Sequence, residues 1–220
     1  MLPSEGCDIL DAGGGTGFYS LPLAAKGHRV TILDLSEKML ELAQRKAERM
    51  GLADKVQTIV GDMETIHQPS SSFDAVICHL ALCHVRNPLN ALKEFSTVLK
   101  KGGLLSLVVE NKIFFSLVEA YRGNLKETLD RLESRKLHIQ LEGLGELLTF
   151  GREELLSMLK ESGFTPTRVM GLRVLSDYLQ HSKAEPDDFP SLRRIETVLS
   201  TKDEISNIGR FHFIVSRNQA

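Results

Sequence analysis

The sequence predicts an α/β fold built on a doubly wound parallel sheet, and three observations support this. Short apolar runs rich in β-branched residues alternate with helical patterns through the first half of the 220-residue chain. A glycine-rich run stands between the first apolar run and the first helical pattern. The apolar runs have the length of strands and are far shorter than a bilayer span. Strands and helices that alternate at this spacing are typical of a parallel sheet covered by helices on both faces.

Five strands are expected in this first half, each an apolar or β-branched run. They are residues 8–12, 28–33, 55–60, 73–79 and 104–110. The helical patterns between them span residues 16–26, 36–50 and 88–99. Ser36 is a favourable N-cap for the second of these helices, and Gly51 supplies its stop.

The second half is less regular. Helical character is expected for residues 114–134, whereas residues 137–150 fit neither pattern clearly. Further helices are expected at residues 152–162, 176–181 and 191–200, the second of them short. A sixth strand is expected at 164–174, an acidic loop at 185–190 and a seventh strand at 211–216. We expect a single domain over residues 1–220, with a core at 8–110 and 150–217. A small helical cap would come from insertions at about 112–150 and 175–207.

The composition limits the function classes. The chain has 27 Lys and Arg against 29 Asp and Glu, a formal net charge of -2, which argues against a broad basic surface for nucleic acid but leaves a local one open. Three cysteines, Cys7, Cys78 and Cys83, are an odd and sparse set that suits a reducing compartment. The first six residues lack the basic stretch and apolar core of a secretory signal. We therefore expect a cytoplasmic protein without a membrane segment.

The strongest functional signal is the run Asp-Ala-Gly-Gly-Gly-Thr-Gly from Asp11 to Gly17. Glycines at the end of a strand let the backbone approach a ligand closely, and the next helix offers free N–H donors at its start. The dinucleotide fingerprint G-x-G-x-x-G fails, because counting from Gly13 its last position falls on Phe18. A phosphate-binding P-loop fails too, because no Gly-Lys pair follows. A tight turn without a ligand is the alternative.

Two acidic residues follow the next two expected strands. Asp34 ends the second strand, where an acidic side chain in doubly wound folds accepts hydrogen bonds from ribose hydroxyls. Asp62 follows the third strand, where it would accept from an adenine amino group while Met63 packs on the ring. The alternatives are a helix-capping Asp34 and an ordinary loop Asp62.

In order and spacing these motifs resemble those of the class I S-adenosylmethionine-dependent methyltransferases. The resemblance covers residues 8–110 and includes the strand 73–79 and the Leu-Lys-Lys-Gly-Gly run at 99–103. It implies a seven-stranded Rossmann-like sheet with an antiparallel last strand. It also implies S-adenosylmethionine as cofactor, S-adenosylhomocysteine as product, and no metal. The cofactor-binding residues that it implies are Asp11, Gly13, Gly14, Gly15, Gly17, Asp34, Leu35, Asp62, Met63 and His79.

A narrower resemblance runs through the rest of the chain. Residues 106–111, 171–179 and 208–212 are similar to the bacterial tRNA methyltransferases that esterify 5-carboxymethoxyuridine at the wobble position. This resemblance implies tRNA as partner and a carboxylate as methyl acceptor. Members of that group carry a helical segment before the first strand, with an arginine near the cofactor carboxylate. Here the first strand is expected at residue 8, so we expect a shortened chain or closure of the site by another segment.

A carboxylate acceptor is ionised at pH 7 and needs no general base, so we assign no catalytic residue with certainty. The site would instead need arginine to hold the acceptor, and Arg173 and Arg210 are the candidates. Tyr178 would add a hydrogen bond, and Asn111 follows the fifth strand, where ligands collect in such sheets. The alternative for the arginines is solvated strand ends.

Other functions stay open. A small-molecule O- or N-methyltransferase would suit the near-neutral charge, and a non-catalytic relative would bind the adenosyl ligand or a protein partner. The two Cys-His pairs at 78–79 and 83–84 do not predict zinc, because they are expected on a buried strand end and the turn after it.

Overall fold

The structure is a computed structural model that describes residues 6–134, 137–141, 145–179 and 189–220. Contacts divide the chain into two compact units. Unit 1 consists of Met1–Leu107, Ser157–Thr167 and Val215–Ala220, and unit 2 of Val108–Leu156 and Arg168–Ile214. Among the described residues, every helix is too short or too polar to cross a membrane.

Seven strands form one sheet, in the order β3-β2-β1-β4-β5-β9-β8. Their bounds are β1 Asp8–Ala12, β2 Arg29–Asp34, β3 Val56–Val60, β4 Phe73–His79, β5 Leu99–Glu110, β8 Phe164–Leu172 and β9 Phe211–Asn218. The pairs β1–β2, β1–β4 and β2–β3 are parallel. The order reverses at β1, as it does in a doubly wound fold, so the predicted fold class is confirmed.

The last strand of the chain runs against its neighbours. The amide of Arg210 donates to the carbonyl of Arg173 (3.3 Å), and that of Gln219 donates to Gly163 (2.9 Å). Residue numbers rise along β9 while they fall along β8, so these two strands are antiparallel. Asn111 likewise donates to the carbonyl of Arg210 at 3.0 Å, and Arg217 Nη1 donates to that of Gly102 at 2.9 Å. The predicted antiparallel last strand is confirmed.

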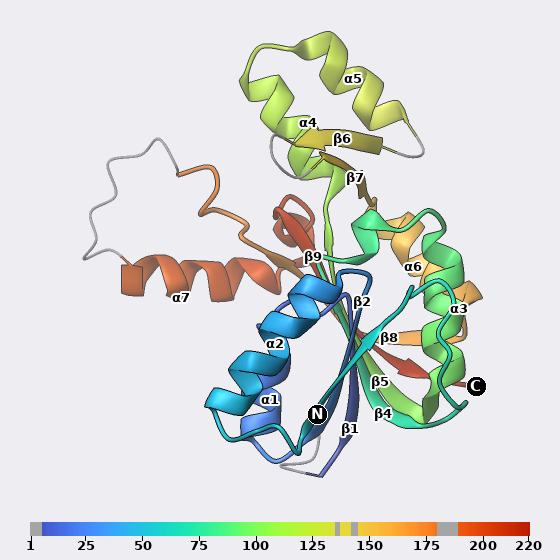
Figure 1. Ribbon diagram of the computed structural model, residues 1–220. Coiled ribbons are helices and arrows are strands. Elements are labelled where there is room, and N and C mark those ends of the chain that lie inside the picture. The colour runs from blue at the N-terminus through green and yellow to red at the C-terminus, as the bar shows by residue number, and fades with distance from the viewer. Residues whose placement is uncertain (1–5, 135–136, 142–144, 180–188) are drawn as a thin grey trace. The chain divides into compact units, whose positions relative to one another are not determined.

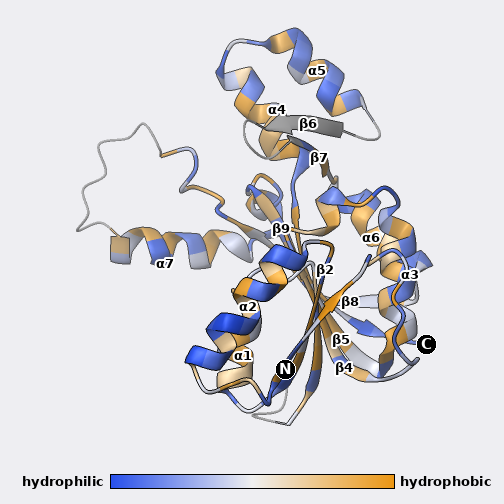
Figure 2. Ribbon diagram, viewed as in Figure 1, coloured by the Kyte–Doolittle hydropathy of each residue, from blue (hydrophilic) through white to orange (hydrophobic). Residues whose placement is uncertain are grey.

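In unit 1, helices cover both faces of the strands. Helices α1 (Ser20–Ala25) and α2 (Glu37–Arg49) lie on one face and α3 (Pro88–Val98) on the other (Figure 1). Ser36 caps α2 by accepting from the amide of Met39 at 3.4 Å, as predicted. Hydrophilic and hydrophobic bands alternate along this helix (Figure 2). Its buried side chains join a core cluster with the strands, which includes Ile9, Val30, Ile32, Leu40, Ala43, Ala47, Ala75 and Ile77.

Helix α1 begins later than predicted. The pattern predicted a helix from residue 16, whereas residues 16–19 form turns and α1 begins at Ser20. Gly13, Gly15 and Gly17 all have positive φ, at 76°, 51° and 77°. A right-handed helix requires negative φ, so the loop continues past Gly17.

Unit 2 contains helices and a hairpin. The predicted helical stretch 114–134 is two helices, α4 (Lys112–Tyr121) and α5 (Leu125–Glu133), separated at Gly123, whose φ is 85°. The ambiguous stretch 137–150 is the antiparallel hairpin of β6 (Leu137–Leu141) and β7 (Gly145–Thr149). The other helices are α6 (Arg152–Glu161), which begins in this unit, α7 (Phe189–Ser200) and α8 (Asp203–Ser206). Residues 176–179 are turns instead of the predicted short helix, and the rest of that segment and most of the acidic loop lie outside the described residues.

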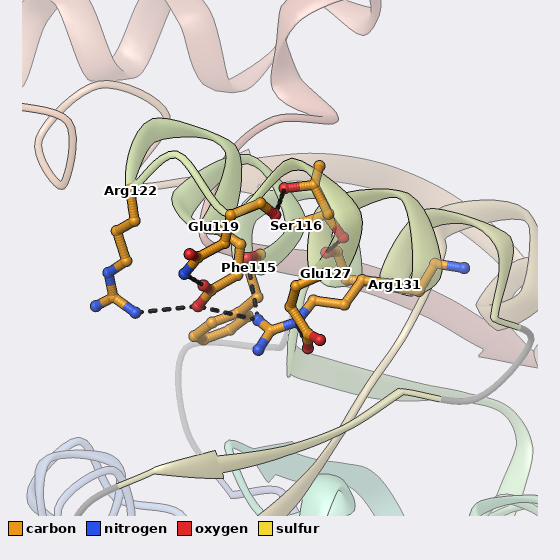
Figure 3. Close-up of polar contacts among 9 residues, drawn as sticks. Phe115, Ser116, Glu119, Arg122, Glu127 and Arg131 are labelled. Atoms are coloured by element: carbon orange, nitrogen blue, oxygen red, sulfur yellow. Dashed lines mark hydrogen bonds and ion pairs between the residues drawn. The ribbon is translucent and has the colours of Figure 1, made fainter.

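A buried carboxylate joins α4 to α5 (Figure 3). Glu119 accepts from Asn124 Nδ2 at 2.8 Å and pairs with Arg122 at 3.0 Å and Arg131 at 3.5 Å. Arg131 also donates to Glu127 at 2.8 Å. The hydrogen bond from Asn124, helped by the two arginines, keeps the pKa of Glu119 below its usual value although burial opposes this. These contacts hold α4 and α5 together.

The close approach of Gly171 to α8 makes a stability prediction for unit 2. A Cβ at this position would lie 1.9 Å from the carbonyl oxygen of Ser206, which is backbone and cannot rotate away. We expect Gly171→Ala to lower the free energy of unfolding by about 3 kcal/mol, measured by denaturant titration. Gly151→Ala is the control, because a Cβ there meets nothing within 4 Å. Equal stability of the two variants would contradict this packing.

Candidate cofactor and acceptor sites

The glycine loop joins β1 to α1 and folds back on β2. The amides of Gly13 and Gly14 both donate to the carbonyl of Leu33, at 2.7 and 3.3 Å. A Cβ on Gly13 would lie 2.3 Å from the Cβ of Ala81. Glycine is therefore required here both for the positive φ and for the close approach of the segment after β4.

Asp11 lies buried beneath this loop, with 2% of its surface exposed. Its Oδ2 accepts from the hydroxyl of Ser20 at 2.6 Å, which ties the end of β1 to the start of α1. Burial raises the pKa of Asp11 to about 6, against the hydrogen bond from Ser20. A Cβ on Gly14 would lie 2.7 Å from the Asp11 carboxyl carbon, so the loop packs directly on this group.

Asp34 stands at the end of β2 and faces the glycine loop. Its Oδ2 accepts from the amide of Gly15 and its Oδ1 from the amide of Ser36, both at 2.9 Å. A carboxylate oxygen accepts more than one hydrogen bond, so both oxygens keep capacity for ligand hydroxyls. The carboxylate thus holds the loop while presenting acceptors at the strand end.

A cavity of about 900 Å³ opens at the carboxyl ends of these strands within unit 1. Five of the predicted cofactor residues line it: Gly13, Asp34, Leu35, Asp62 and Met63. Gly14, Gly15 and Gly17 belong to the adjoining loop, and His79 immediately precedes Leu80 and Ala81, which also line the cavity. Sequence reasoning missed several lining residues that follow β3 and β4, including Glu64, Thr65, His84, Val85, Arg86 and Asn90. Their position after parallel strands was the signal that would have found them.

His79 ends β4 and is held by two neighbours. Its Nε2 lies 2.8 Å from the hydroxyl of Ser106, and the ring of Tyr19 meets it edge-on at 4.6 Å between centroids. Burial lowers the pKa of His79 to about 4. The imidazole is therefore neutral at pH 7 and can exchange a hydrogen bond without adding charge.

In unit 2 the two predicted arginines share an acidic partner. Arg173 pairs with the carboxylate of Asp177, which is 2% exposed, and Arg210 Nη1 lies 3.8 Å from the same oxygen. Arg210 Nε also lies 4.0 Å from Glu110 Oε2. Burial raises the pKa of Glu110 to about 7, against the attraction of Arg210. Sequence reasoning missed both carboxylates. Glu110 is far from Arg210 along the chain, so no local pattern marks it. Asp177 follows Arg173 by four residues, and that spacing was the signal that would have found it.

Aromatic rings surround Arg210. Its guanidinium carbon lies 5.1 Å from the centroid of Phe211 and 5.9 Å from those of Phe114 and Phe115. Tyr178 packs edge-on against Phe114, with centroids 5.5 Å apart, and its hydroxyl donates to the carbonyl of Ile208 at 3.1 Å. Cation–π contact and partial burial hold the guanidinium plane in a defined place.

Asn111 is fully buried and bonded within the protein. Its Nδ2 donates to the carbonyls of Asn207 and Gly209, each at 2.7 Å, and its Oδ1 accepts from the amide of Ile113 at 2.9 Å as the N-cap of α4. A contact with substrate would require some of these bonds to be exchanged.

Glu196 of α7 holds the segment that carries Arg173 and Asp177. Its carboxylate accepts from three successive amides, those of residues 174, 175 and 176, at 2.6 to 2.9 Å. Arg173 has a φ of 55°, in the left-handed region that non-glycine residues rarely adopt. The chain is thus turned sharply at the predicted acceptor residues and fixed by one carboxylate.

Among the described residues, no group of three or more His, Cys, Asp or Glu side chains is placed to hold a metal ion. Cys78 and Cys83 are both buried, and burial raises the pKa of the Cys78 thiol. A buried thiol with a raised pKa is a poor ligand, since metals bind the thiolate.

The chain is similar in sequence to several known proteins. A family described as "Methyltransferase domain" matches residues 10–107. The tRNA 5-carboxymethoxyuridine methyltransferase of Escherichia coli K12 is 27% identical over 210 residues, which are 95% of this chain and 79% of that protein. A ubiquinone biosynthesis O-methyltransferase of Methylocella silvestris is 33% identical over 121 residues, 55% of this chain and 46% of that protein.

Solved structures share the fold. An S-adenosylmethionine-dependent methyltransferase of Mesorhizobium loti has a TM-score of 0.67 at 20% identity and covers 99% of this chain and 94% of its own. Another from Methanosarcina mazei has a TM-score of 0.69 at 22% identity over 99% and 94%. Residues 10–107 therefore match a methyltransferase domain, and the chain shares its fold with solved S-adenosylmethionine-dependent methyltransferases.

Proposed function

We propose that this methyltransferase esterifies a carboxylate on a modified wobble uridine of tRNA. The observation that carries the proposal is the extent of the likeness to the Escherichia coli tRNA enzyme, which spans 95% of this chain. The likeness to the Methylocella quinone enzyme spans 55%. An alignment over nearly the whole chain must include most of unit 2, where Arg173, Tyr178 and Arg210 lie.

The cavity of unit 1 would hold the cofactor, which supplies an electrophilic methyl group on a sulfonium. Asp34 would accept hydrogen bonds from the ribose hydroxyls through oxygens that already fix the glycine loop. Asp62 would accept from the adenine amino group, and Met63 would pack on the ring. Gly13 and Gly14 would admit the ligand close to the backbone, and His79 would offer a neutral hydrogen-bonding group.

Arg173 and Arg210 would hold the acceptor carboxylate through one oxygen and leave the other free to react. An ionised carboxylate is already the nucleophile, so alignment and exclusion of water are the main tasks of the protein. Both arginines contact Asp177, and Arg210 approaches Glu110. The acceptor would therefore bind beside two carboxylates, and the charge on Glu110 decides how strongly the cluster attracts an anion.

The acceptor affinity should for this reason depend on pH. Below about pH 7, Glu110 is mostly protonated and the cluster of Arg173, Arg210 and Asp177 has a net charge of +1. Above that pH, Glu110 ionises and the net charge of the four groups falls to zero. We expect kcat/KM for the tRNA acceptor to fall about fivefold from pH 6 to pH 8, and Glu110→Gln to flatten this profile. A profile that is the same in both proteins would contradict this role of Glu110.

Methyl transfer to tRNA tests the proposed function. The acceptors are tRNA carrying 5-carboxymethoxyuridine and the same tRNA without the modification, with a radiolabelled methyl donor. We expect label only in the modified tRNA, released as methanol by mild alkali because the product is an ester. Arg173→Ala should lower this turnover while S-adenosylhomocysteine binding stays unchanged. Alkali-stable label, or none in either tRNA, would contradict the proposal.

A small-molecule acceptor is the second candidate, favoured by the net charge of -2 and by the likeness to the quinone enzyme. The two candidates differ in salt dependence, because phosphate contacts release counterions and weaken steeply as salt rises. Acceptor binding that does not change between 50 and about 200 mM salt would favour the small molecule.

A further inference from the structure

Two separate segments form the wall of the cavity beyond Asp34. One is residues 61–65, which follow β3. The other is residues 84–90, which run from the last residue of the single-turn helix η1 (Leu82–His84) into the first turn of α3. Residues 61–65 and 85–87 belong to no helix or strand. Backbone of this kind loses conformational freedom when it is ordered around a ligand, so whatever orders it in advance strengthens binding.

One side chain bridges the two segments. Glu64 Oε1 accepts from the amide of Arg86 at 2.8 Å, and Oε2 accepts from the amide of Asn87 at 3.0 Å. Asn87 is the N-cap of α3, so the carboxylate also lies near the positive end of that helix dipole. Both carboxylate oxygens of Glu64 therefore accept hydrogen bonds from the backbone of the opposite segment.

Two more contacts fix the segment from which Glu64 projects. The amide of Glu64 donates to Asp62 Oδ1 at 2.9 Å, and the amide of Ile66 donates to Glu94 Oε2, from α3, at 2.7 Å. A side chain of residues 62–66 thus accepts from backbone at the start of α3, and a side chain of α3 accepts from the backbone of residues 62–66. Asp62, which would receive the adenine amino group, is oriented by the backbone of the bridging residue itself.

We propose that Glu64 is a positioning residue that orders both wall segments at the adenosine end of the cofactor cavity before the cofactor binds. It acts through Asp62 and through residues 84–90, by holding them and not by chemistry of its own. The proposal rests on the assignment of this cavity to the cofactor made above.

Calorimetric titration of the full chain with S-adenosylhomocysteine tests it, with adenosine as a second probe for the adenosine end alone. We expect Glu64→Ala to weaken both ligands by the same factor, about tenfold, with a less favourable binding entropy. Glu64→Gln keeps one acceptor oxygen and the side-chain volume, so we expect it to recover part of the loss and to bind about threefold more weakly than the unsubstituted chain. Glu161→Gln is the matched control, because it breaks only an exposed ion pair between Glu161 and Lys93 of α3.

The outcomes are distinct. Unchanged affinity in Glu64→Ala would overturn the proposal, as would a loss confined to S-adenosylhomocysteine with adenosine binding intact. If Glu64→Ala fails to fold, Glu64→Gln provides the test. A partial loss of ligand affinity at an unchanged unfolding midpoint would support the proposal, and unchanged affinity in that variant would overturn the proposal. Failure of the unsubstituted chain to bind would contradict the cofactor cavity itself and the role of Glu64 with it, whereas a failure of tRNA methylation alone would leave both standing.

Discussion

Replacing Asp34 by alanine is expected to weaken S-adenosylhomocysteine binding about 100-fold. Two hydrogen bonds from ribose hydroxyls to a carboxylate contribute about 1.5 kcal/mol each, and every 1.4 kcal/mol is a factor of ten in affinity. The substitution also removes the bonds that Asp34 accepts from Gly15 and Ser36, so the glycine loop loses its link to the end of β2. Both effects act in the same direction.

Calorimetric titration measures this loss, and two variants sharpen it. Asp34→Asn keeps one acceptor oxygen and should fall between alanine and the unsubstituted chain. Asp54→Ala, at an exposed turn before β3, should bind like the unsubstituted chain. If Asp34→Ala bound within threefold of the unsubstituted chain, the ribose would not lie against this carboxylate.

Alanine at position 13 is expected to abolish cofactor binding and to lower the free energy of unfolding by about 3 kcal/mol. The new Cβ would lie 2.3 Å from the Cβ of Ala81, an atom that moves only with its backbone, and 3.0 Å from Met63 Cε. The φ of 76° adds the strain of a left-handed residue. Either the glycine loop or the segment after β4 must shift, and both line the cavity.

Gly51→Ala separates the clash from the backbone strain. Gly51 also has a positive φ, of 68°, but a Cβ there meets nothing within 4 Å. This control should cost about 1 kcal/mol and leave binding unchanged. Thermal unfolding and calorimetry report the two quantities for both variants. Cofactor binding that survives in Gly13→Ala would show that the ligand does not need the close approach of Ala81 to the glycine loop.

Local signals predicted most of unit 1. The β-branched run at 28–33, the cap at Ser36 and the stop at Gly51 act within a few residues of one another, so their elements could be read directly. Element ends were less certain, since β5 begins at Leu99, five residues before the strand predicted at 104. Edges of this kind depend on pairing with strands that are distant in the sequence.

Long-range partners could not be predicted in the same way. The glycine loop and Asp34 follow strand ends at family spacing, and they do meet. The link from Glu64 to residues 86 and 87, and the pairing of Arg210 with Glu110, join residues whose types are common everywhere. The hairpin at 137–149 was ambiguous because its short apolar runs suit either a helix or a strand.

The most direct test of the cofactor cavity is calorimetric titration of the full 220-residue chain with S-adenosylhomocysteine, with NAD as the control ligand. The geometry of Gly13, Asp34 and Asp62 predicts a dissociation constant in the micromolar range or tighter for the first ligand and no binding of the second. Absence of S-adenosylhomocysteine binding, or equal binding of NAD, would contradict the assignment of this cavity to the methyl donor.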